Sequence, residues 1–145
     1  MALRFFATKN NRIHFKHDVS DFLTDYMQGV ARKSIKFDQN AELQLFKRVW
    51  HIVAAAMPNG VAFQGKTDDD RSFGPFSPTL FEMVSVGIAQ NIEAVEPLDP
   101  AAVRQKRNGL IKEGKHQALT GSGSNSRKKF RKRLDLANCW FKPDA

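Results

Sequence analysis

The chain has 145 residues, 41% of them hydrophobic, and a formal net charge of +8 at pH 7. This length predicts a single domain with one core, and the ordinary apolar content excludes a disordered chain. No apolar run approaches the roughly 18 residues that span a bilayer, and the first residues lack the layout of a signal peptide. Together with a lone cysteine, Cys139, these features exclude a disulfide scaffold and predict a cytoplasmic protein with no membrane partner.

The positive charge is concentrated in one third of the chain. Residues 104–133 contain eleven Lys or Arg and one acid, Glu113, which gives +10. The remainder contains twelve bases and fourteen acids, which gives −2. Such asymmetry is typical of a protein that binds a polyanion, although a ribosome-like protein or one that binds a membrane surface would have the same charge distribution.

Apolar periodicity and capping signals predict that the first half of the chain is helical. The chain begins with the apolar turns LRFF, and a second helix starts at Asp18 or Ser20, whose side chains can accept from free backbone N–H groups. A third helix is capped by Asp38 or Asn40 and stops at the Pro-Asn-Gly turn of residues 58–60. The apolar stripes of the second and third helices consist of Phe22, Leu23, Tyr26, Met27, Val30, Leu43, Phe46, Val49, Trp50, Val53 and Met57.

The middle of the chain, residues 61–75, has an irregular pattern. It predicts at most one short hairpin, near Val61 to Phe76. The three adjacent aspartates Asp68, Asp69 and Asp70 could attract a divalent cation. Consecutive side chains diverge, however, and nothing nearby completes an oxygen cage, so we expect a solvated loop.

Two helices in the second half share one start signal, a capping residue followed by proline. The capping residues are Ser77 and Asp99. The first of these helices contains Gly87, which costs about 1 kcal/mol relative to alanine, so we expect a neighbouring helix to approach closely there. The second has a candidate break at Asn108-Gly109.

The last helix follows a glycine-serine loop and has a basic face. Ser124, Asn125 or Ser126 can cap a helix that begins near Arg127. Free N–H groups at a helix start attract anions, and cationic side chains beside them favour phosphate. A terminal helix with a solvated basic face is the alternative. The apolar stripe consists of Phe130, Leu134, Ala137 and Phe141, and the opposite face carries Arg127, Lys128, Arg131 and Lys132.

We therefore predict an all-α protein in which residues 1–145 form a single domain of five or six helices, with a short irregular or hairpin segment in the middle. Its basic third, residues 104–133, is predicted to contact nucleic acid, in particular duplex DNA. Neither basic helix has an evident edge of base-reading residues, so phosphate contacts should dominate. The predicted contacts are Arg104, Lys106, Arg107, Lys112, Lys115, Arg127, Lys128, Lys129, Arg131, Lys132 and Arg133.

Signatures of an enzyme are missing from the sequence. His14 and His17 have a spacing typical of metal ligands, but no further ligand motif accompanies them. His51 is expected to be partly buried and hydrogen-bonded within its helix. We predict no catalytic residue, no metal and no cofactor, and the alternative of a small hydrolase or ribonuclease would use His51 or His116. Three acids are expected to be solvated on helix faces: Glu82, Glu93 and Glu113.

Several segments, in order, resemble the helical second half of the GmrSD-type proteins, which are bacterial defence and restriction proteins. The resemblance extends from Leu3 to Ala137 and is carried by LRFFA, VSDFLTDYM, AELQLFKRVWHIV, FSPTLFEMVSVGIA and LTGSGSNSRKKFRKRLDLA. It implies an all-helical region that follows the nuclease-associated, ParB-like domain of a modification-dependent DNA restriction system.

The chain departs from that family in its catalytic parts. The family's Asp-Gly-Gln-Gln-Arg motif and the His-Asn-His motif of some members have no equivalent in this sequence. No catalytic residue can therefore be carried over, and we expect a fragment, a decayed copy, or a subunit that works beside a separate ParB-like catalytic chain. Two functions remain open: nucleic-acid contact through the basic third, or an interaction module that only packs on the catalytic domain.

Overall fold

The computed structural model describes residues 1–66 and 72–143, and the aspartates Asp68–Asp70 lie outside this range. The described chain is all-α, as predicted. Its α-helices are six of ten residues or more and one of four residues, α5, which lies between α4 and α6. The sequence predicts five or six helices. The elements are α1 (Ala2–Asn11), η1 (Arg12–His14), α2 (Val19–Ala31), α3 (Gln39–Ala56), η2 (Val61–Phe63), β1 (Gly65–Lys66), β2 (Ser72–Phe73), α4 (Pro78–Gln90), α5 (Ile92–Val95), α6 (Pro100–His116) and α7 (Arg127–Phe141).

The predicted helix caps are confirmed, and the middle of the chain forms a short hairpin, within the prediction of at most one. β1 and β2 pair antiparallel, with Gly65 opposite Phe73. Each helix with a predicted cap begins after a side chain that accepts from the backbone N–H three residues later. α6 is continuous, so the break considered at Asn108-Gly109 does not occur. The capping residues are Asp18, Asp38, Ser77, Asp99 and Ser126.

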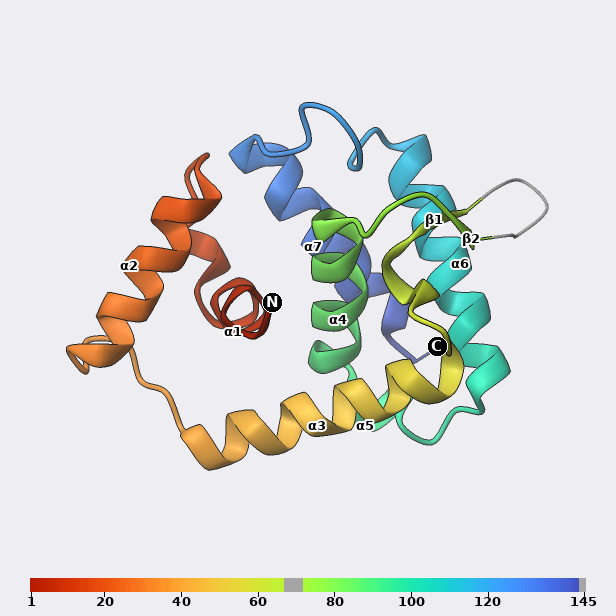
Figure 1. Ribbon diagram of the computed structural model, residues 1–145, viewed down its shortest axis with the longest axis horizontal. Helices are drawn as coiled ribbons and strands as arrows, with labels where there is room; N and C mark the ends of the chain where they lie inside the picture. Colours follow the sequence, from red (N-terminus) through yellow and green to blue (C-terminus); the bar gives the residue numbers. More distant parts are fainter. Residues whose placement is uncertain (67–71, 144–145) are drawn as a thin grey trace.

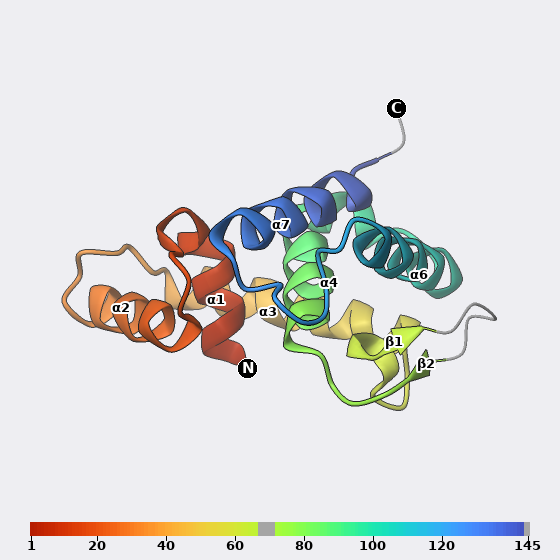
Figure 2. The ribbon, with the colours of Figure 1, turned by 90° about the horizontal axis from the view of Figure 1, so that it is seen from above.

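Helix α4 lies at the centre of the molecule. Figure 1 and Figure 2 show it with α1 on one side and α6 on the other, while α3 crosses one end and α7 lies along another face. Every residue from Thr79 to Ala89 is buried. The buried residues include the polar side chains of Thr79, Glu82 and Ser85, so α4 is enclosed by its neighbours on its polar side as well as on its apolar side.

The core contains residues of the predicted apolar stripes together with residues of α4. Val53, Phe81, Ile88 and Leu134 are buried, whereas Trp50 is only partly buried and packs against the core at the centre of an aromatic cluster. Its ring lies 4.6 Å from Phe46, 5.7 Å from Phe81 and 5.9 Å from Phe5, measured between ring centroids. Leu43 and Met27 are exposed despite their place on the stripes, and the first turns of α3 extend beyond α4 (Figure 1).

At Gly87, α4 packs closely against α7. A Cβ atom on this residue would lie 2.7 Å from Phe141 Cδ2 and 3.0 Å from the carbonyl oxygen of Ala137. Real Cβ contacts do not fall below 3.0 Å, so only glycine permits this separation of the two backbones. The expected close approach of a neighbouring helix is therefore confirmed.

We expect Gly87→Ala to lower the free energy of unfolding by about 1–2 kcal/mol. The helix propensity gained, about 1 kcal/mol, is outweighed because α7 must move away from α4. Gly29→Ala is the comparison, since its new Cβ would meet mainly the flexible end of the Ile35 side chain. Urea unfolding of both variants measures the difference, and equal stability of the two would contradict the assigned helix contact.

Candidate nucleic-acid interface

The first two turns of α7 carry the densest group of exposed cations. Arg127, Lys128 and Lys132 are exposed, while Lys129 and Arg131 are half-buried. Arg131 donates from Nη2 to the carbonyl oxygen of residue 13 at 2.7 Å, which holds the start of α7 against η1. Ser126 caps the helix, with its side chain accepting from the N–H of residue 129.

Helix α6 carries a second group of cations. Arg104, Lys112 and Lys115 are exposed and Lys106 is half-buried. Arg104 donates from Nε to the carbonyl oxygen of Ala56 at 2.7 Å and so satisfies a backbone oxygen at the end of α3. Its positive charge remains at the surface.

Two amide side chains share this face of α6. Gln105 and Asn108 line a cleft of about 500 Å³ together with Arg104 and Lys112. Residues 105, 108 and 112 follow at intervals of three and four along this side of α6. The expectation that neither basic helix has a base-reading edge stays a prediction. Asn108 Oδ1 already accepts from Arg107 Nη1 at 3.0 Å. Gln105 is exposed and its side chain forms no hydrogen bond with another described residue.

The cations of the basic third lie on two different helices, α6 and α7. Both ribbon views place α4 between α6 and the first turns of α7 (Figures 1 and 2). The basic third of the sequence thus divides in space into an α7 group (Arg127, Lys128, Lys132) and an α6 group (Arg104, Lys112, Lys115).

Arg107 does not belong to the predicted surface, because its side chain is buried with 1% exposure. It donates from Nε to Ala62 O at 3.0 Å, and from Nη2 to Val61 O at 2.7 Å and to Gln64 O at 2.6 Å. Burial lowers the pKa of Arg107 to about 10, which still leaves the guanidinium protonated at neutral pH. Its role is to satisfy backbone oxygens of the η2 segment.

Arg133 is also removed from the predicted surface, since it is fully buried. It donates to Glu82 Oε2 from Nε at 3.1 Å and from Nη2 at 2.5 Å, and Nη1 donates to Ser124 O. Glu82 is 1% exposed and was wrongly expected to be solvated. Its Oε1 accepts from Arg4, from Nε and Nη2, at 2.7 Å.

The other polar residues considered from the sequence form no further site. His14 and His17 line a cleft of about 200 Å³ with aspartates of α2, but the part of the chain that the structure describes contains no group of three His, Cys, Asp or Glu able to hold a metal. His51 is exposed, not partly buried. Glu93 is exposed and pairs with Arg48 at 2.9 Å.

None of the described helices has the length and apolar character to cross a membrane.

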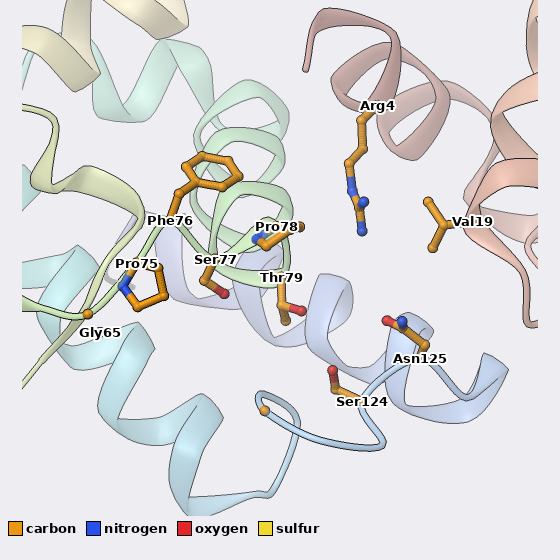
Figure 3. A pocket seen from close by; sticks show the side chains of 12 residues that line it. Arg4, Val19, Gly65, Pro75, Phe76, Ser77, Pro78, Thr79, Ser124 and Asn125 are labelled. Atoms are coloured by element: carbon orange, nitrogen blue, oxygen red, sulfur yellow. The ribbon is translucent and has the colours of Figure 1, made fainter.

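A cleft of about 610 Å³ lies beside the start of α7, and the sequence did not indicate it (Figure 3). The Arg4 guanidinium extends from α1 toward Thr79, Ser124 and Asn125. Arg4 was missed because it lies in the apolar start of the chain, more than 100 residues from the loop that it faces. The remaining lining residues are Val19, Gly65, Gly74, Pro75, Phe76, Ser77, Pro78 and Gly121.

Comparison with protein-family models, with curated proteins and with solved structures gave no match to this chain.

Proposed function

We propose that this protein is an accessory helical domain that binds duplex DNA, mainly through phosphates. The observation that carries the proposal is the α7 group. Arg127, Lys128 and Lys132 are exposed within two turns of a helix start, and no carboxylate among the described residues forms an ion pair with them. Cations of this kind release condensed counterions when they contact phosphates, which favours binding without sequence preference.

The α6 group supplies a second contact in this proposal. Arg104, Lys112 and Lys115 add phosphate contacts, and Gln105 is placed where it can reach a base edge. A duplex that contacts both groups has to reach from α6 to the first turns of α7. We expect non-specific affinity in the range of about 10⁻⁴–10⁻⁶ M at physiological salt.

We further propose a division of labour, which the sequence resemblance to GmrSD-type proteins supports. The helical chain would hold DNA for a ParB-like catalytic domain or subunit that carries the hydrolytic residues. On this proposal the protein is not itself an enzyme and functions in restriction or phage defence in the cytoplasm.

A second function, an interaction module that packs on a catalytic domain without touching DNA, is favoured by exposed apolar side chains. Leu3, Met27 and Leu43 are exposed on α1, α2 and α3. Co-purification with a catalytic chain in the absence of any salt-sensitive DNA binding would support this function over the first.

The α7 group provides the test of the proposed function. We expect simultaneous replacement of Arg127, Lys128 and Lys132 by Gln to weaken duplex binding at least about tenfold. The slope of log affinity against log salt concentration should become shallower by about 2.7, since each phosphate contact contributes about 0.9. Fluorescence anisotropy with a labelled duplex at several salt concentrations measures both quantities.

A control variant removes the same charge from another part of the surface. Lys33, Lys36 and Lys47 are exposed in and around α2 and α3, and their joint replacement by Gln also lowers the net charge by three. We expect this variant to retain most of the affinity and the slope. If the two triple variants bind alike, the basic face of α7 is a solvated surface and the interaction-module function is preferred.

A further inference from the structure

The charges buried next to the cleft of Figure 3 do not balance. Glu82 receives two arginines, Arg4 on Oε1 and Arg133 on Oε2, each through two nitrogens. All the favourable acceptor positions of the carboxylate are therefore occupied. Two guanidinium groups and one carboxylate leave this triad with one positive charge, at a site where Arg133 and Glu82 are almost fully removed from water.

The net positive charge of the triad lies beside the cleft, because the Arg4 side chain lines it. Its Nε and Nη2 point to Glu82, and Nη1 has no partner among the residues that the structure describes. Arg4 is also the one charged side chain among the described residues that line the cleft. An anion in the cleft would therefore neutralise the triad at a partly desolvated position, where charge pairs are stronger than at an open surface.

The other polar groups around this space can all donate hydrogen bonds. The hydroxyls of Thr79 and Ser124 form no hydrogen bond with any described residue, and Asn125 presents an exposed amide. Figure 3 shows these side chains around the space that Arg4 enters. Several donors from different elements suit a group with three acceptor oxygens, such as a phosphate monoester, better than a carboxylate with two.

The size and the apolar part of the cleft indicate what the phosphate is attached to. A volume of about 610 Å³ lies within the range of small-molecule sites, roughly 300–1,000 Å³, and exceeds the needs of a single phosphate. Val19, Pro75, Phe76 and Pro78 supply apolar surface beside the polar groups. This combination fits a nucleoside body next to the phosphate.

We propose that the cleft binds the phosphate monoester of a nucleotide. Two sources carry this chemistry: a free mononucleotide, or the 5′-phosphate at the end of a nucleic-acid strand. The second source deepens the proposed function and rests on it, because Asn125 lies two residues before Arg127 and so joins the cleft to the α7 group.

The test places a negative charge in the cleft without changing side-chain size. We expect the full chain to bind adenosine 5′-monophosphate more tightly than adenosine in isothermal titration calorimetry. Asn125→Asp should reduce the affinity for the monophosphate at least about tenfold, since like charges at close range repel. Asn125 is exposed, so the fold is expected to persist, and circular dichroism checks this.

Asn40→Asp is the matched control, because Asn40 is also exposed and lies at the start of α3. This variant should bind the monophosphate like the unmodified chain. The proposal is overturned if the monophosphate binds no better than adenosine, or if the Asn125 and Asn40 variants bind it equally.

Duplexes with and without a 5′-phosphate distinguish the two sources. Tighter binding of the phosphorylated duplex that disappears in Asn125→Asp assigns the cleft to strand ends. Equal binding of both duplexes, with the monophosphate still bound, assigns it to a free nucleotide. Binding of the 5′-hydroxyl duplex reports on the α7 group alone, so failure of the proposed function is measured separately.

Discussion

Glu82→Gln is expected to reduce the free energy of unfolding by about 3–5 kcal/mol. The substitution keeps the size of the side chain but leaves Arg133, which has no solvent exposure, without its counter-charge. Removing one partner of a buried ion pair costs this much because the other charge remains buried and uncompensated. A domain of this kind is stable by about 5–15 kcal/mol in total, so urea unfolding should show a large fall in the midpoint.

Two further variants distinguish the loss of the buried ion pair from the general effect on stability of losing a carboxylate. Glu93→Gln removes an exposed acid, 82% accessible in its side chain, and should cost less than about 1 kcal/mol. The double variant Glu82→Leu, Arg133→Met removes both charges and should be more stable than Glu82→Gln. A loss from Glu82→Gln no larger than that from Glu93→Gln would show that the pair is not buried in solution.

Phe81→Ala is expected to cost about 3–5 kcal/mol, the usual loss when a buried phenylalanine is truncated. Phe81 is 1% exposed, and its ring lies 5.7 Å from Trp50 and 5.2 Å from Phe63 between centroids. The cavity would open within the aromatic cluster that joins α3 to α4. Tryptophan fluorescence therefore provides a local signal in addition to the unfolding midpoint.

Phe76→Ala is the control for this substitution. Phe76 also contacts the cluster, with its ring 5.9 Å from Phe81, but it is 44% exposed. Its truncation should cost less than about 1.5 kcal/mol, because much of its surface is already in water. If both variants lost the same stability, the aromatic core would be centred elsewhere than on α4.

The fold class followed from the sequence because its signals are local. A cap such as Ser77 acts on backbone groups three residues away, and apolar residues at helical spacing define a buried face within a single helix. The number of helices was less certain, since α5 has only four residues and leaves no periodic pattern. The enclosure of α4 was not predicted, because Glu82 on this helix was expected to be solvated and is buried.

The candidate site was harder to predict from the sequence, because the charge of a side chain does not show whether it is buried or exposed. Arg107 and Arg133 were counted as surface cations, yet each falls on the apolar stripe of its helix: Arg107 lies four residues after Val103, and Arg133 three after Phe130. That spacing was a usable signal of burial. The pairing of Glu82 with Arg4 and with Arg133 had no such signal, since it joins three helices that are far apart in the sequence.

The enclosure of α4 also affects how the chain acquires its structure during synthesis. Its most extensive contact is with α7, so the face of α4 that packs against α7 cannot be covered until the ribosome has made the residues up to Phe141. At about 5–20 residues per second this delay lasts several seconds. During that interval a strongly apolar helix is exposed in the nascent chain, and we infer that α4 is the segment that a chaperone would hold until α7 emerges.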